Sequence, residues 1–366
     1  MSIKFRLLKN LSSTLGLVFI LSGCGTTVDW DYPRTSSTAF DQPQTSAIGA
    51  LFQEAADQHP GQSGFSLVRQ GGQAFTARVA MADLAERTLD AQYYIWDVDT
   101  TGRIMAERLM RAAERGVRVR LLLDDHYQTE EIDLGVGALD AHPNVEVRFF
   151  NPVANRRWRT WSFLNEFSRA NHRMHNKLFI MDNAVAIVGG RNIGDTYFGV
   201  RPDQNFRDLD LAMTGPIVRD LSASFDLFWN SEWAIPAGAV VEERATERDF
   251  QALKKRVAEK ISAAGYPYPV DEQVADLRGR LAEIRDALIW APGQVLVENP
   301  ARVDADDGNI ITEALLRRLG ETRRELLIES PYFILLDRGI EIMRTITDRG
   351  VKVRVLTNSA ATNDVM

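Results

Sequence analysis

The sequence has very little cysteine and no excess of positive charge. Its 366 residues include one cysteine, which excludes an internal disulfide framework and any metal site built from several cysteines. Asp and Glu (50) outnumber Lys and Arg (43), giving a formal net charge of −7. Proteins that coat nucleic acid usually have the opposite balance, so we expect no nucleic-acid partner. Hydrophobic residues make up 45% and charged residues 25%, as in a globular chain of two domains.

The sequence also lacks a hydrophobic run of the length that a transmembrane helix needs. The apolar run over residues 11–21 has about half of the ~20 residues required. It follows the positive charges of Lys4, Arg6 and Lys9, and this order is typical of a signal peptide. The sequence therefore predicts a signal peptide over residues 1–24.

The predicted signal peptide ends in Leu21-Ser22-Gly23-Cys24, which resembles the lipobox of bacterial lipoproteins. We expect Cys24 to be acylated and exposed as the new N-terminus; the alternative is an uncleaved short anchor with an incidental cysteine. Two or three acyl chains give stable anchoring. We therefore expect the protein in the cell envelope, anchored by lipid to a membrane on the periplasmic side. Residues 25–48, rich in Thr, Ser, Pro and Asp, are predicted to form a flexible tether.

An internal repeat is present at an offset of 234 positions (114 to 348). Residues 114–125 read ERGVRVRLLLDD, and residues 348–359 read DRGVKVRVLTNS. An apolar strand and a helical pattern precede each copy, so each predicts a strand, a helix, a turn at Gly116 or Gly350, and a second strand. Such βαβ units imply parallel pairing and occur in any α/β protein. The shared RGV-(R/K)-V-R core favours a duplication.

The repeat divides the predicted α/β protein into unequal parts. The first copy belongs to a predicted domain over residues 49–235, and the second to a partial domain over residues 296–366 that stops just after its second strand. Charged helical patterns over residues 241–264 and 271–288 fit neither copy. We therefore interpret residues 236–295 as an insertion between the domains or a cover over the site.

The sharpest cluster of reactive residues begins at His175. On a strand, His175 and Lys177 project from one face about 7 Å apart. Such a pair suits attack on a phosphodiester, because the imidazole can bond to phosphorus while the ammonium holds the non-bridging oxygens. Asp182 can order neighbouring donors, Gly190 permits close approach of the backbone, and Asn192 offers amide donors to a phosphate. The alternative is a core histidine with an edge lysine, but the spacing H-x-K-x4-D followed by GG-x-N is demanding.

Several motifs accompany this cluster. They are HPG (59–61), SG (63–64), LDAQYYIW (89–96), RGVRVRLLLDD (115–125), FNP (150–152), HRMHNK (172–177), GGRNIGD (189–195) and DLD (208–210). Together they resemble the HKD motif and its surroundings in the phospholipase D superfamily, and more narrowly the bacterial cardiolipin synthase C branch. The resemblance extends from about residue 50 to the C-terminus, apart from the helical insertion.

The resemblance implies two fused α/β domains, each with a mixed or parallel sheet flanked by helices and one HKD motif. It implies a reaction through a phosphohistidine that needs no metal or other cofactor. His175 would be the nucleophile or the general acid, Lys177 and Asn192 would bind phosphate, and Asp182 would organise the motif. The expected function is a phosphatidyltransferase acting on anionic membrane phospholipids. A phospholipase D-type hydrolase is the alternative, and a nuclease of the superfamily is less favoured.

The repeat offset places a second HKD motif near position 409, beyond residue 366. None of the other histidines begins an H-x-K pattern: His59, His126, His142 and His172. We therefore expect a chain truncated before the second motif, with an incomplete second copy and no activity as a monomer. Two routes to activity are pairing with a second chain, against which the open sheet of the incomplete second copy argues, and a complementing second half. A catalytically silent lipid-binding lipoprotein is the non-enzymatic alternative.

A basic segment leads into the motif. Its members are Arg156, Arg157, Arg159, Arg169, Arg173 and Lys177, interleaved with Trp158, Trp161, Phe163 and Phe167. Basic charge with aromatic residues favours a rim that faces lipid headgroups. The alternatives are a surface for single-stranded nucleic acid or a solvated loop whose aromatic residues fold into the core.

Overall fold

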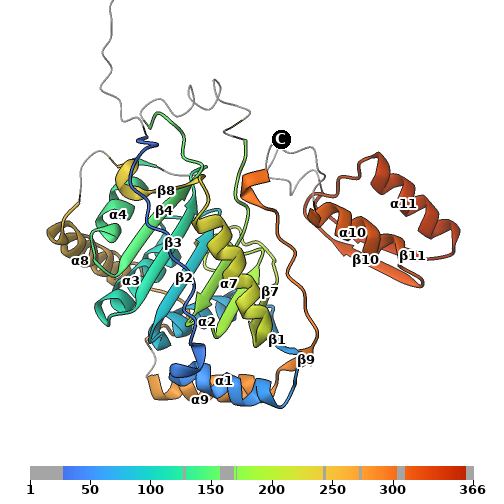
Figure 1. Ribbon diagram of the computed structural model, residues 1–366, viewed down its shortest axis with the longest axis horizontal. Coiled ribbons are helices and arrows are strands. Elements are labelled where there is room, and N and C mark those ends of the chain that lie inside the picture. Colours follow the sequence, from blue (N-terminus) through green and yellow to red (C-terminus); the bar gives the residue numbers. More distant parts are fainter. Residues whose placement is uncertain are drawn as a thin grey trace, which may run out of the picture.

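The computed structural model describes residues 28–126, 129–156, 169, 171–241, 245–271, 274–302 and 310–359. It contains a nine-stranded sheet flanked by helices and a separate two-stranded sheet near the C-terminus (Figure 1). Within the described ranges, no helix combines the length and apolarity needed to cross a membrane.

The large sheet is mixed, as predicted for the fold class. Its order is β8-β4-β3-β2-β5-β6-β7-β1-β9. β2, β3 and β4 are parallel, whereas β5, β6 and β7 pair antiparallel. The strands are β1 Ser63–Val68, β2 Thr88–Tyr93, β3 Arg118–Asp124, β4 Val145–Phe150, β5 Leu178–Met181, β6 Val185–Gly189, β7 Asp210–Thr214, β8 Ala234–Pro236 and β9 Ile289–Ala291.

Helices cover both faces of this sheet. They are α1 Ala47–Asp57, α2 Gly71–Leu84, α3 Thr100–Glu114, α4 Glu130–Asp140, α7 Pro216–Trp229, α8 Glu247–Ala264 and α9 Val274–Asp286, with short 3-10 turns at Pro43–Thr45, Asp195–Tyr197, Ala237–Ala239 and Pro300–Arg302. One core lies between the sheet and α2, α3 and α4, and a second lies between the sheet and α7. Because side chains alternate along a strand, Leu121 of β3 joins the first core and Leu122 joins the second.

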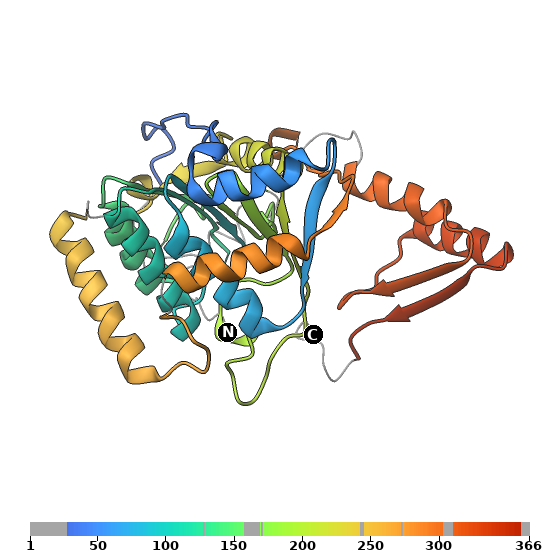
Figure 2. The same cartoon turned by 90° about the horizontal axis from the view of Figure 1, so that it is seen from below.

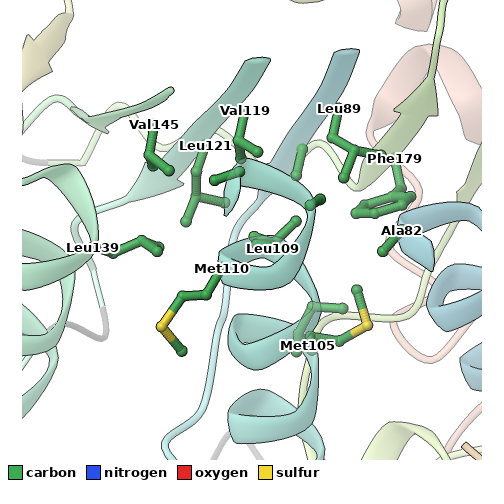
Figure 3. Packing of buried hydrophobic residues seen from close by; sticks show 14 of the residues in the cluster. Ala82, Leu89, Met105, Leu109, Met110, Val119, Leu121, Leu139, Val145 and Phe179 are labelled. Carbon is green, nitrogen blue, oxygen red and sulfur yellow. The ribbon is translucent and has the colours of Figure 1, made fainter. Parts of the chain in front are cut away.

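The first βαβ unit forms where the repeat predicts it. The Asp99 carboxylate accepts a hydrogen bond from the backbone N–H of Gly102 (3.0 Å), which caps the start of α3. Gly116 follows the helix with φ of 92°, a conformation that favours glycine. Figure 3 shows Leu109 of α3 packed toward Leu121 of β3.

The predicted insertion covers the helical layer. α8 buries Phe250, Leu253 and Val257 and packs on α3 and α4, while α9 packs on α2 and α1 (Figure 2). β9, which also falls within residues 236–295, extends the large sheet by pairing with β1. Both helices thus pack on the helices of the first domain, while the interpretation of the segment as a cover over the site stays a prediction.

Residues 28–42 are held against the large sheet by hydrogen bonds, whereas the sequence predicted a flexible tether over residues 25–48. This segment, the N-terminal strap, runs along the molecule toward α1 (Figure 1). The buried guanidinium groups of Arg148 and Arg120 donate hydrogen bonds to the carbonyls of Thr35 and Ser37. Buried charges require such partners, and the strap supplies the acceptors.

The small sheet repeats the βαβ pattern. Its elements are α10 Ile310–Gly320, β10 Glu325–Glu329, α11 Asp337–Asp348 and β11 Lys352–Leu356. β10 and β11 are parallel, as are β2 and β3. Gly350 has φ of 83°, close to that of its counterpart Gly116, so the turn predicted by the repeat forms in both copies.

Candidate active site

The site lies at one end of the large sheet. β2, β3 and β4 finish at this end, and the antiparallel β5 begins there, since Gln92 near the end of β2 pairs with Leu178 at the start of β5. His175 and Lys177 immediately precede β5. We call this the His175 end of the sheet and the opposite end the Asp182 end.

His175 and Lys177 contact each other, although neither lies on a strand, where their side chains would be about 7 Å apart. The Lys177 Nζ lies 3.2 Å from His175 Nδ1 and donates a 2.8 Å hydrogen bond to the His175 carbonyl. Lys177 is buried (7% exposed), whereas His175 is exposed at the surface. The Tyr94 ring, which follows β2, lies 4.4 Å from the imidazole centroid and 5.4 Å from Nζ. Tyr94 therefore packs against both groups.

The electrostatics keep His175 neutral. Partial burial of the imidazole and, second, the Lys177 ammonium lower the pKa of His175 to about 4. Burial also lowers the pKa of Lys177 to about 8, while the Asp208 and Asp124 carboxylates oppose that shift. Near neutral pH the pair is thus an uncharged imidazole beside an ammonium ion.

Asp124 holds the segment before His175 in place. This fully buried carboxylate accepts hydrogen bonds from the backbone N–H groups of Met174 (2.7 Å) and His126 (2.8 Å). It also forms an ion pair with Arg173 (3.2 Å). Burial raises the pKa of Asp124 to about 6, against the opposing effect of Arg173. The end of β3 is therefore joined to the residue directly before the candidate nucleophile.

Asp182 lies at the other end of β5. Its carboxylate accepts three backbone hydrogen bonds, from Arg87 and Thr88 (both 2.8 Å) and from Glu86 (3.1 Å). It is fully buried and has φ of 51°. This geometry fits the expectation that Asp182 organises neighbouring donors, while its grouping with the catalytic residues stays a prediction. Asp182 is a positioning residue at the start of β2.

Asn192 and Gly190 lie at the His175 end but have structural partners. The Asn192 side chain accepts from the Ile95 N–H (3.0 Å) and donates to the Tyr197 hydroxyl (2.9 Å). A Cβ at Gly190 would lie 2.3 Å from Asp208 Oδ1, so this glycine makes room for a carboxylate. Phosphate binding by Asn192 and Gly190 stays a prediction.

The structure adds residues that the motif alone did not indicate. Tyr94 lies between two imidazoles, with its ring stacked on His126 at 5.9 Å and packed on His175. Asp124 and Asp208 supply the nearby negative charge. The sequence could have indicated them by their positions, since Asp124 ends the apolar strand β3 and Asp208 lies two residues before the start of β7.

The predicted lipid-facing rim is described only in part. Arg156 pairs with Asp125 and Asp133, Arg169 donates to the Asn151 side chain, and Arg173 pairs with Asp124; the other members of the rim upstream of Lys177 lie outside the described residues, as does Cys24. These three guanidinium groups thus serve the fold. In the part of the chain that the structure covers, no group of three or more His, Cys, Asp or Glu side chains is arranged to hold a metal ion.

Comparisons with known proteins match the chain as follows. The family described as "Cardiolipin synthase, PLD-like domain" matches residues 79–229. Cardiolipin synthase C of Escherichia coli (strain K12) is 38% identical over 310 residues, which are 84% of this chain and 65% of that protein. An uncharacterized protein of Helicobacter pylori (strain ATCC 700392 / 26695) is 31% identical over 352 residues, covering 95% of this chain and 70% of that protein.

Among solved structures, the phosphatidylserine synthase of Haemophilus influenzae Rd KW20 has a similar fold. The TM-score is 0.50 at 12% sequence identity, over 84% of this chain and 66% of that one. This likeness supports the mixed α/β architecture alone. The chain thus spans slightly less than two thirds of the length of the Escherichia coli relative and of this structure.

Proposed function

The chain belongs to the phospholipase D superfamily, and from this premise we propose that it is a cardiolipin synthase-like phosphatidyltransferase acting through a phosphohistidine. The observation that carries the proposal is the contact between His175 and Lys177 at the His175 end of the sheet. A neutral imidazole beside a buried ammonium suits attack on a phosphodiester, whose charge increases at the non-bridging oxygens.

In the proposed first step, His175 is the nucleophile. Its low pKa makes it a poor proton donor and leaves a lone pair at neutral pH. A non-bridging oxygen of the lipid phosphate competes with His175 for the Lys177 ammonium, which frees the ring nitrogen. The nitrogen bonds to phosphorus as the bond from phosphorus to the leaving glycerol oxygen breaks. That oxygen then takes a proton from a second group.

The second step decides between transferase and hydrolase. If the hydroxyl of another phospholipid attacks the phosphohistidine, the products are a joined lipid and free His175; if water attacks, the product is phosphatidic acid. The Escherichia coli relative, whose name is Cardiolipin synthase C, favours the first outcome. We propose anionic membrane phospholipids as substrates, and a second chain or a complementing half as the source of the proton donor.

We also propose that the protein is a lipoprotein anchored through Cys24 in the cell envelope. The support is the order of positive charges, apolar run and lipobox at the start of the sequence. Replacing Cys24→Ser is expected to abolish acyl labelling and to slow signal cleavage. A variant that keeps its label and fractionates unchanged would contradict this assignment.

His175→Asn is the direct test of the catalytic assignment. We expect turnover of phosphatidylglycerol to fall by at least ~10²–10⁴-fold, because a nucleophile and its proton transfers are lost together. The matched control is His59→Asn, a histidine that stacks on Trp290 away from the site. Both variants are assayed with the second chain or complementing half that supports turnover, and circular dichroism checks that they fold. Turnover near the wild-type level in His175→Asn would reject the proposal.

The pH profile gives a second test. Below pH of about 4 the imidazole of His175 is protonated and loses its lone pair, and above pH of about 8 Lys177 loses its charge. Turnover is therefore expected to rise on the acidic side and to fall through about 8 on the alkaline side. The arginine of Lys177→Arg keeps its charge at high pH. The pH at which turnover falls on the alkaline side should therefore be higher in this variant, even though its turnover is lower. An unshifted alkaline fall would exclude Lys177 as its cause.

A further inference from the structure

We infer that the N-terminal strap holds the His175 end of the sheet against the phospholipid bilayer, so that the lipid anchor and the active site face the same surface. The inference rests on the proposed acylation of Cys24. It goes beyond anchoring, because an anchored domain on a long tether has no fixed orientation, whereas a domain held by a short one does.

The start of the strap is fixed to the large sheet. The backbone N–H of Val28 donates to the carbonyl of Ala154 (3.0 Å), and that of Asp29 donates to the carbonyl of Ala239 (3.0 Å). Val28 is buried (6% exposed). The Arg34 side chain donates to the Trp30 carbonyl (2.9 Å), which closes the first turn of the strap. Backbone hydrogen bonds to the loop after β4 and to the 3-10 turn Ala237–Ala239 leave this segment little freedom.

The strap begins at the His175 end. Ala154 follows β4, which finishes there together with β3. The guanidinium of Arg169 lies 5.1 Å from the Trp30 ring centroid and also donates to the Pro152 carbonyl (3.2 Å). Arg173 then joins the neighbouring Asn151 carbonyl (2.9 Å) to Asp124, the carboxylate that positions the residue before His175. A continuous series of contacts therefore connects Trp30 with the active site.

The short length of chain between Cys24 and Val28 fixes which end of the large sheet faces the membrane. Four peptide units separate Cys24 from Val28, and they span at most ~14 Å. A free tether over residues 25–48 would reach roughly 80 Å, more than enough for any face to meet the membrane. The strap also runs the full length of the sheet, because the Asn183 side chain at the Asp182 end donates to the Phe40 carbonyl (2.8 Å). An anchor at Cys24 therefore keeps the Asp182 end away from the bilayer.

Exposed apolar side chains at the His175 end fit a bilayer surface. Trp30 is 39% exposed, and Leu209, which follows Asp208 at the start of β7, is 48% exposed. Phe206 in the same loop is 38% exposed and packs on Tyr197 at 5.1 Å. Tryptophan with one edge packed and one edge free is favoured at the level of lipid headgroups. The partner of this end is thus a phospholipid bilayer.

The test compares one labelled position at each end of the sheet. The thiol of Cys24 is blocked by acylation, so Arg207→Cys and Glu54→Cys each provide one free thiol, at the His175 end and on α1 respectively. Both positions are exposed and outside the proposed machinery. Full-length lipidated protein is labelled with an environment-sensitive dye and reconstituted into vesicles of phosphatidylethanolamine and phosphatidylglycerol that carry a lipid-bound quencher.

We expect loss of fluorescence at position 207 and none at position 54. Equal quenching at the two positions, or quenching at position 54 alone, would overturn the inference. Acyl labelling of Cys24 is measured on the same vesicles. An unlabelled Cys24 would count against the proposed anchoring on which the inference rests, whereas the quenching contrast reports the orientation.

Lengthening the tether isolates the role of the strap. Twenty Gly and Ser residues inserted between Thr26 and Thr27 would leave the lipobox and Val28 intact while extending the reach to roughly 80 Å. We expect acylation to be unchanged and the contrast between positions 207 and 54 to shrink. A contrast that is unaffected by the insertion would show that the short connection does not set the orientation.

Discussion

β3 of the large sheet and β11 of the small sheet share a sequence motif but differ in burial. Val119 in β3 is fully buried, whereas its counterpart Val353 in β11 is only half-buried. Leu121 is 2% exposed, and its counterpart Val355 is 39% exposed. Both strands nevertheless pair in parallel with the strand before them, through a helix and a left-handed glycine.

The difference lies in the partners. β3 has β2 on one side and β4 on the other, and cores on both faces. β11 has β10 alone as a neighbour in the described chain, and Leu327 of β10 is 61% exposed. A short motif thus specifies a local βαβ unit, while burial depends on elements far away in the sequence. Matched substitutions in the two copies separate these contributions.

The largest difference is expected for a buried charge. Val119→Asp places a carboxylate in a core without a partner and should lower the free energy of unfolding by roughly 3–5 kcal/mol. Val353→Asp places the same group where water reaches it, so the main unfolding transition should not move. Urea denaturation followed by circular dichroism measures both. A comparable loss in the two variants would contradict the difference in burial.

Truncation of an apolar side chain should give a smaller difference of the same sign. Leu121→Ala leaves a cavity in the larger core and should cost about 2–5 kcal/mol. Val355→Ala removes an exposed group and should change the free energy of unfolding by at most ~0.5 kcal/mol. Differential scanning calorimetry of the two variants against the parent gives the comparison. A large effect of Val355→Ala would reveal a partner that covers β11.

The sequence predicted features that depend on neighbours along the chain. The spacing of His175 and Lys177 indicated one shared site, and the repeat indicated both βαβ units. The position of Asp124 beside Met174 could not be predicted in this way, because 50 residues separate the two partners. Likewise, only the folded sheet shows that Asp182 caps the start of β2 rather than joining His175.

The N-terminal strap shows the same limit. Thr35 and Ser37 belong to a segment whose composition is typical of a tether. The segment is held against the sheet because Arg120 and Arg148, once buried, require hydrogen-bond acceptors, and the carbonyls of the strap supply them. Composition describes a segment by itself, whereas these contacts depend on residues more than 80 positions away.

The smallest difference is expected at the two glycines, where the local backbone alone decides the outcome. A Cβ added at Gly116 (φ of 92°) or Gly350 (φ of 83°) would meet open space, so alanine would suffer backbone strain but no clash. Gly116→Ala and Gly350→Ala should each cost about 1 kcal/mol. The cost should appear as faster hydrogen exchange of the following strand, β3 or β11 respectively.

Gly135→Ala within α4 is the control, because alanine in a helix interior should stabilise by about 0.5–1 kcal/mol. The two turn variants should lose similar amounts of free energy of unfolding. A difference between them larger than the change in the Gly135→Ala control would show that burial also contributes at the turns, which would contradict a purely local effect there.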